Sequence, residues 1–144
     1  MVELPGIEAI TVDQGTVART DVDGKAIYGV NSNALTYVVG DRLDAMYLRD
    51  RMIDKYPDVM NTENVGQMPN NAIFHAEATV LLRAARADGG TLSGRNLHIR
   101  VDRKICRDCR TVLPYVAMEL GNPVVTFADP RGVVETFHNG MWRK

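Results

Sequence analysis

Short segments rich in apolar residues alternate along this chain with polar segments that have the composition of turns. The first two apolar segments, residues 24–30 and 35–39, are separated by Asn31-Ser32-Asn33. Two apolar runs with a short polar turn between them predict a β-hairpin. Residues 1–23 show little pattern apart from residues 10–12, so they predict a lead-in segment with one short strand.

Helical spacing follows in two longer segments. In residues 42–55 the apolar positions form one broad stripe, which indicates a helix packed on a sheet, and Asp41 is placed to cap it. Residues 72–87 are apolar on nearly every side and predict a helix inside the protein, capped by Asn70 or Asn71. Polar groups on this buried helix would need partners.

The rest of the chain predicts three strands and one further helix. Residues 96–101 alternate as a strand, residues 106–120 carry the apolar side of a helix, and residues 123–127 and 132–137 are two more strands. The link at residues 129–131 is too short for a parallel crossover, so the last two strands are expected to be antiparallel. The predicted fold class is α/β: a three-layer α/β/α sandwich with a five-stranded mixed sheet.

Length and composition are those of one globular domain. The chain has 144 residues, 45% of them hydrophobic and 24% charged, which is enough for a core without disulfides. We place the domain at residues 24–144, after the lead-in at residues 1–23. No apolar run reaches the roughly 18 residues that a membrane helix needs, so no membrane span is expected.

Charge is nearly balanced overall but unevenly distributed. The formal net charge is −1. Five of the 17 Lys and Arg residues nevertheless fall close together, at Arg100, Arg103, Lys104, Arg107 and Arg110. Either the last four bind a phosphate backbone, or the cluster is only a solvated strand end and helix start. We favour nucleic-acid binding, because these charges flank the residues described next.

Four residues have the pattern of a catalytic zinc site. His75, Cys106 and Cys109 supply three of the four ligands that zinc needs, with the last position open for water. Glu77 is not needed as a ligand and is placed to move protons. Residues two apart on a helix point about 200° apart, so His75 and Glu77 share a site only at a helix end. H-x-E followed by C-x-x-C is the signature of zinc-dependent nucleobase deaminases.

Two other interpretations of the cysteine pair remain open. C-x-x-C is also a dithiol redox motif, although that motif normally follows the first strand of a βαβ unit and gives His75 no role. A structural zinc site would use the same ligands, but it would not need the Glu77 carboxylate. We favour a catalytic zinc centre over both.

These motifs resemble those of the cytidine-deaminase-like superfamily, and within it the deaminase domains at the C-termini of bacterial polymorphic toxins. The Leu113-Pro114 pair after the second cysteine is similar to the sequence of the DNA-deaminating toxins at this place. The C-x-D-C form of the thiol pair, with Asp129-Pro130-Arg131 and Phe137-His138-Asn139-Gly140, is similar to DYW-type domains of plant RNA-editing proteins. The resemblance covers roughly residues 24–142. It departs at Ile105, where the family usually has proline.

The resemblance implies a mechanism and a set of substrate contacts. Glu77 would take a proton from water and deliver it to N3 of cytosine and later to the departing amine, which leaves uracil. The backbone amide of Ala76 would hold the base carbonyl. Asn31, Asn33 and Asn71 are candidates to orient the base or the ribose, although each is also placed as a turn or cap residue.

The expected substrate is nucleic acid, with single-stranded DNA preferred over RNA because of the toxin-like motifs. A free nucleoside or another small amine is the alternative, although it gives the basic cluster no role. The resemblance also implies a monomer that is delivered as the C-terminal domain of a larger secreted effector. It would act as a mutagenic antibacterial toxin in the target-cell cytoplasm and be neutralised by a cognate immunity protein.

Overall fold

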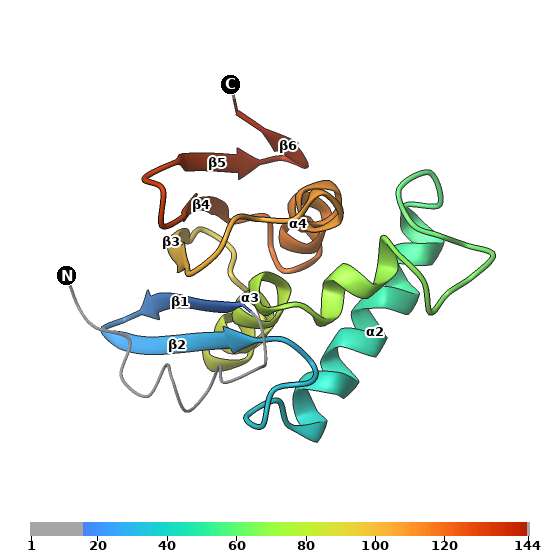
Figure 1. Cartoon of the computed structure of the whole chain (residues 1–144), viewed down its shortest axis with the longest axis horizontal. Coiled ribbons are helices and arrows are strands. Elements are labelled where there is room, and N and C mark those ends of the chain that lie inside the picture. The colour runs from blue at the N-terminus through green and yellow to red at the C-terminus, as the bar shows by residue number, and fades with distance from the viewer. Residues whose placement is uncertain (1–15, 144) are drawn as a thin grey trace.

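Six strands form one mixed sheet in the computed structural model, which describes residues 16–143 (Figure 1). The strands are β1 (Val17–Val22), β2 (Lys25–Val30), β3 (Asn96–Val101), β4 (Val124–Ala128), β5 (Val134–His138) and β6 (Met141–Trp142). Their order across the sheet is β2-β1-β3-β4-β5-β6. Only β3 and β4 are parallel neighbours. The expected mixed sheet is therefore confirmed, but the expected number of five strands was wrong.

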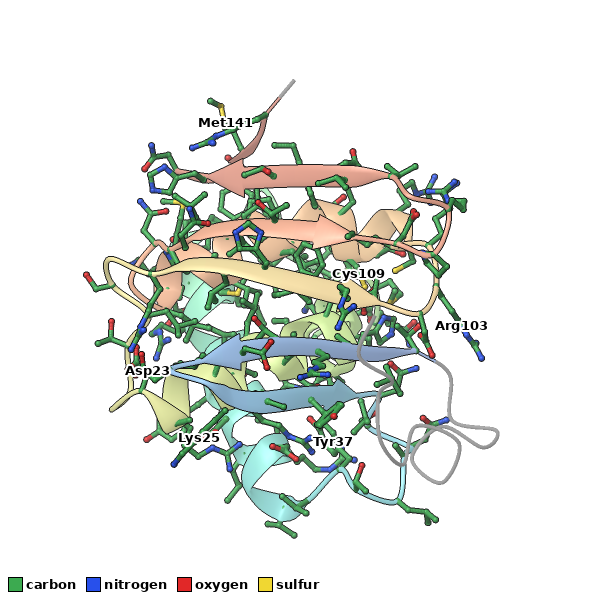
Figure 2. The ribbon with its side chains drawn as sticks, turned by 90° about the vertical axis from the view of Figure 1, so that its left-hand side faces the viewer. Asp23, Lys25, Tyr37, Arg103, Cys109 and Met141 are labelled. Carbon is green, nitrogen blue, oxygen red and sulfur yellow. The ribbon has the colours of Figure 1, made fainter. Side chains whose placement is uncertain are left out.

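The described helices all lie on one face of this sheet (Figure 2). They are α2 (Val39–Lys55), the 3₁₀ helix η1 (Asn70–Phe74), α3 (Ala76–Ala87) and α4 (Arg107–Glu119). α3 packs against β1 and β2, and α2 packs on α3, η1 and α4 from the outer side. For residues 16–143, the expectation of helices on both faces was wrong. The helix expected to pack on the sheet, α2, packs on other helices instead.

Alternation along the strands explains this one-sided arrangement. In β3, Leu97 and Ile99 are buried, whereas His98 between them is exposed. Leu97 lies beside Val125 of β4 in the sheet, so the buried side chains of neighbouring strands share the helical face. α3 lies between that face and α2, and nine of its 12 residues are buried. None of the described helices is both long and apolar enough to span a membrane.

The first hairpin lies earlier in the chain than predicted. β1 and β2 are joined by Asp23-Gly24, whose φ angles are both positive, 51° and 83°. Such two-residue turns match the natural twist of paired strands, and β1 therefore belongs to the sheet although its residues were assigned to the lead-in. Residues 35–39 form no strand, and Leu35 there is 86% exposed. The strand expected at residues 10–12 lies outside the described residues.

The C-terminal strands tie the edge of the sheet to α4. β4 and β5 are antiparallel, as predicted. The additional strand β6 pairs with β5 and sets Trp142 edge-on against Phe137, with ring centroids 4.9 Å apart. The indole N–H of Trp142 donates a hydrogen bond to the backbone oxygen of Arg110 on α4 (2.8 Å).

A buried carboxylate holds the start of α2 against α3. Asp41 is 3% exposed and accepts hydrogen bonds from Arg83 (2.6 Å) and Arg86 (2.7 Å) of α3. It also accepts one from the backbone N–H of Val38, so it caps α2 from within the first turn. Arg83 donates in addition to the backbone oxygen of Tyr28 on β2 (2.9 Å). The network therefore fixes α2 relative to both the sheet and α3.

We expect Asp41→Asn to destabilise the protein by about 2 kcal/mol at pH 7. Burial acts to raise the pKa of Asp41, but hydrogen bonds from Arg83, Val38 and Arg86 outweigh burial and lower this pKa from 3.8 to about 2. A pKa lowered by nearly two corresponds to about 2 kcal/mol of stability. Because the folded-state pKa is the lower one, this stability is complete above about pH 5 and is lost as the pH falls towards 2.

Urea denaturation of wild type and Asp41→Asn at several pH values measures this effect. The difference in unfolding free energy should be largest at neutral pH and should shrink as the pH falls through 4. Asp54→Asn is the matched control, because Asp54 is an exposed aspartate on the same helix. A loss of stability that stays constant from pH 7 to pH 2.5 would assign the effect to packing rather than to charge.

Candidate active site

His75 lies at a break between two helices. η1 ends at Phe74, and α3 begins after His75, which is its N-cap in extended conformation (φ −87°, ψ 167°). The helix expected to run unbroken from residue 72 is therefore interrupted, and the predicted asparagine caps are wrong. Asn70 instead is buried and holds the preceding loop through side-chain hydrogen bonds. The break puts His75 at the helix end that it must share with Glu77.

Cys106 has the same place on α4. It is the N-cap of that helix, again in extended conformation (φ −72°, ψ 161°), and its Sγ accepts a hydrogen bond from the backbone N–H of Cys109 (3.3 Å). Both cysteines are free thiols. Nδ1 of His75 is 3.2 Å from Sγ of Cys109 and 3.9 Å from Sγ of Cys106. The three predicted ligand atoms thus lie within 4.8 Å of one another.

These separations fit a tetrahedral zinc ion. Usual Zn–S and Zn–N bond lengths place ligand nitrogen and sulfur about 3.6 Å apart, between the two distances seen here. Burial lowers the pKa of His75, so its imidazole stays neutral and able to ligate. Burial, together with the neighbouring Glu77 and Cys106, raises the pKa of Cys109. Such a thiol becomes a thiolate only beside a cation, which a bound zinc ion would supply.

Glu77 is a buried acid in the first turn of α3. It is 3% exposed, and burial, helped by the negative charge of Asp102, raises its pKa from 4.5 to about 7. A carboxyl group with a pKa near neutrality accepts and releases protons with similar ease at pH 7. Its negative charge also raises the pKa of Cys109, so the carboxyl group and this thiol are close enough to interact electrostatically.

The residues predicted to contact substrate differ in their hydrogen-bond partners and in their exposure. The backbone N–H of Ala76 donates to Oδ1 of Asn31 (2.9 Å), so this amide, expected to hold a base carbonyl, is engaged by a neighbouring side chain. Asn31 thereby lies at the edge of the site. Asn71 donates to the backbone oxygen of Gly66 (2.7 Å) and lines a pocket beside His75. Asn33 is exposed in the loop after β2.

The pocket beside His75 has a volume of about 410 Å³. Its lining residues are Ser32, Arg42, Arg49, Asn71, Phe74 and His75. The two arginines were not predicted as site residues. Their spacing of seven places them on one side of α2, but only the fold brings that side to His75.

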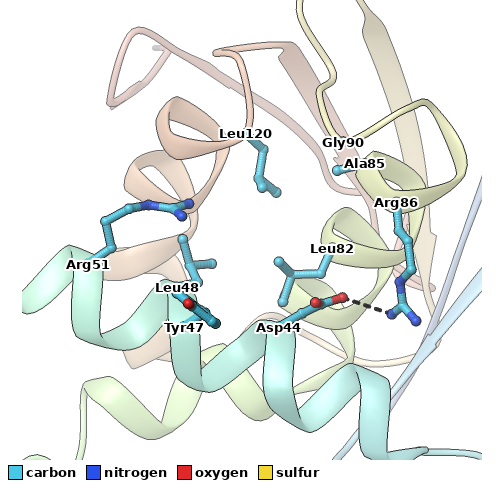
Figure 3. Close-up of a pocket in the computed structure, with 9 residues that line it drawn as sticks. All are labelled: Asp44, Tyr47, Leu48, Arg51, Leu82, Ala85, Arg86, Gly90 and Leu120. Carbon is cyan, nitrogen blue, oxygen red and sulfur yellow. Dashed lines mark ion pairs between the residues drawn. The ribbon is translucent and has the colours of Figure 1, made fainter.

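A second cavity lies between α2, α3 and α4 (Figure 3). It has a volume of about 290 Å³ and is crossed at one edge by the ion pair of Asp44 with Arg86 (3.1 Å). None of the four residues of the predicted zinc site lines it. His75 instead lines the pocket of about 410 Å³, which is therefore the candidate substrate pocket.

The basic cluster divides into free and engaged side chains. Arg103, Lys104 and Arg107 are exposed, and Arg103 extends away from the ribbon (Figure 2). Within residues 16–143 these three form no ion pair. Arg110 instead pairs with Glu135 and lies over the ring of Trp142, 4.5 Å from its centroid. Three of the four predicted nucleic-acid contacts thus remain open to a ligand.

Curated proteins include no match to this chain. A family model described as MafB19-like deaminase matches residues 3–126, which include His75, Glu77 and both cysteines. The match begins before the resemblance drawn from the motifs and includes β1. It confirms the likeness to deaminases of the polymorphic-toxin type, and the chain belongs to the MafB19-like deaminase family.

Proposed function

We propose that this protein is a zinc-dependent hydrolytic deaminase that converts cytosine to uracil in nucleic acid, with single-stranded DNA as the preferred substrate. One observation carries the proposal. In a member of a deaminase family, His75, Cys106 and Cys109 converge within 4.8 Å, and the buried acid Glu77 follows His75 by two residues in the first turn of α3. A purely structural zinc site would gain nothing from that carboxyl group.

The site residues have two roles, holding the metal ion and transferring protons. His75, Cys106 and Cys109 would hold the zinc, which when bound acts as a Lewis acid and activates water at neutral pH. Glu77 accepts the proton of the water that adds to C4 of cytosine, and it delivers that proton to N3. It then carries the proton of the hydroxyl group now on C4 to the exocyclic amine, so that the C4–N bond breaks, ammonia leaves and the carbonyl of uracil forms. A pKa of about 7 suits both directions of transfer.

The positive charge next to the site favours nucleic acid over a free nucleoside as the substrate. Arg103, Lys104 and Arg107 are exposed next to Cys106, where they would attract a phosphate backbone. In a single strand the target base is unstacked at little cost, which favours single-stranded DNA or RNA over a duplex. Deamination of RNA or of a free nucleoside are the alternative functions.

The toxin role rests on family resemblance. In that role the domain is delivered as the C-terminal part of a larger secreted effector, acts in the cytoplasm of a target cell and is neutralised by an immunity protein. Expression of the intact gene should then lower viability and raise C-to-T mutation unless a neutralising partner is present. Harmless expression of active enzyme at high level would argue against this role.

A substrate panel tests the enzymatic proposal. The purified protein should contain about one zinc per chain and should convert C to U fastest in a single-stranded DNA oligonucleotide. Double-stranded DNA, RNA and free cytidine are the parallel substrates. Faster turnover of RNA or of cytidine would select one of the alternatives, and bound zinc without turnover of any of them would indicate a structural site.

A further inference from the structure

We propose that Arg42 and Arg49 form a binding subsite for a phosphate group of the substrate, in the pocket whose wall includes His75. The inference rests on the proposed deaminase function and extends it. The established family match and the zinc motif assign nothing to α2. The subsite would supply contacts that a free nucleoside, which has no phosphate, does not use.

The first support is the position of the two arginines around one aromatic ring. Both guanidinium carbons lie 5.9 Å from the ring centroid of Phe74. Phe74 directly precedes His75, so contacts that hold the Phe74 ring in place also help to position the predicted zinc ligand. The two cations therefore lie at the residue next to a predicted zinc ligand, in a pocket that His75 itself lines.

The second support is that the positive charge of the pocket is poorly neutralised. Within residues 16–143, Arg42 makes one long hydrogen bond, to the backbone oxygen of Ser32 (3.4 Å), and no ion pair. It also lies over the uncharged ring of Tyr37, 5.3 Å from the ring centroid. Arg49 is 17% exposed, and its partner Asp50, at 3.3 Å, is 67% exposed. Among the described residues, none that lines the pocket is acidic.

The chemistry of these groups selects the ligand. Arginine offers planar pairs of donors that match phosphate oxygens, and charge-assisted hydrogen bonds of this kind are strong. Ser32 and the Asn71 side chain add polar groups to the same wall. The pocket volume of about 410 Å³ exceeds that of one phosphate, so it also has room for part of the attached sugar.

The arrangement also gives a path for a polynucleotide. His75 lines the arginine pocket and contacts Cys109 of α4. The exposed Arg103 and Arg107 stand on the segment that leads into and begins α4. His75 thus lies between two basic surfaces, and a strand that crosses the site would place one phosphate on each side of the target nucleotide.

Binding of fluorescein-labelled single-stranded DNA to the zinc-loaded protein tests the subsite without requiring turnover. For Arg42→Gln/Arg49→Gln we expect Kd to rise at least about tenfold at low salt. The slope of log Kd against log salt should fall by about 0.7 for each phosphate group that the variant no longer binds. Arg51→Gln is the matched control, because Arg51 lies on the same helix and is paired with Glu119 outside the pocket.

Two further variants keep the test decisive if the double variant folds poorly. Arg42→Gln changes only an exposed side chain and should by itself weaken binding by part of that amount. Arg42→Lys/Arg49→Lys keeps the charge but loses the planar donor pairs, so it should weaken binding less than Arg42→Gln/Arg49→Gln does. Unchanged Kd and salt slope in a folded Arg42→Gln/Arg49→Gln protein would overturn the proposal, even if the protein proves to be a deaminase of another substrate.

Deamination kinetics then identify the source of the phosphate. A rise in KM for dCMP in the double variant, with deoxycytidine unaffected, would assign the subsite to a terminal phosphate. A rise for the oligonucleotide alone would assign it to the DNA backbone. An equal rise for deoxycytidine would overturn the proposal, because the arginines would then act through packing of Phe74. If no substrate is turned over, the binding measurement still decides the subsite while the proposed function fails.

Discussion

Glu77→Gln is expected to lower kcat for cytosine deamination by a factor of about 10² to 10⁴, the usual contribution of a general acid–base group. Glutamine has nearly the same shape and cannot carry the proton. The side chain is buried, and burial raises its pKa to about 7. At pH 7 the neutral amide therefore replaces a carboxyl group that is already partly protonated. The fold should therefore survive, and the loss should lie in kcat rather than in KM.

Zinc content separates this role from a structural one. Glu77 is outside the predicted ligand set, so Glu77→Gln should bind as much zinc as wild type, measured by elemental analysis of the purified protein. Glu63→Gln makes the same chemical change at an exposed position and should leave kcat unchanged. A kcat for Glu77→Gln within a few-fold of wild type would remove Glu77 from the mechanism.

The residues of the candidate site could be predicted because the signal is local. H-x-E and C-x-x-C each occupy a few positions, and helix geometry alone requires that His75 and Glu77 share a site only at a helix end. The structure adds the way in which this is achieved. His75 and Cys106 are both N-caps in extended conformation, so two helix starts present their ligands to one point.

The first hairpin lies elsewhere than predicted because apolar content alone does not determine which segment is buried. Residues 35–39 are apolar, yet Leu35 and Val39 are 86% and 75% exposed. The correct signal was present at Asp23-Gly24, a strong hairpin dipeptide with alternating residues before it. Periodicity identifies a strand or a helix, but whether its apolar residues are buried depends on how the rest of the chain packs.

The arginine pocket could not have been predicted, for a related reason. Arg42 and Arg49 share one side of a helix, and that much is visible in the sequence. Their contact with Phe74 depends on how η1 packs on α2, which is tertiary structure. From the helix spacing alone, a basic helix face exposed to solvent is as good a prediction as a binding pocket.

One glycine links the sheet to the site. Gly29 on β2 lies directly against the first turns of α3, where a Cβ atom would meet the backbone oxygen of Ala76 and lie 2.5 Å from the backbone nitrogen of Val80. Both obstacles are backbone atoms, which cannot turn aside as a flexible side chain would. Only glycine therefore lets α3 approach β2 closely enough to hold its first residues, Ala76 and Glu77, in place.

We expect Gly29→Ala to destabilise the protein by about 3 kcal/mol or more, the upper part of the range for overpacking, which corresponds to a fall in Tm of roughly 10 °C. Thermal and urea denaturation measure this loss. Protein that still folds should bind zinc more weakly, because α3 must move and take His75 with it. Gly66→Ala is the matched control, since a Cβ there meets nothing within 4 Å, and it should change stability by less than about 0.5 kcal/mol. Equal stabilities for the two variants would mean that β2 and α3 separate freely, and the close contact would then not be what positions the site.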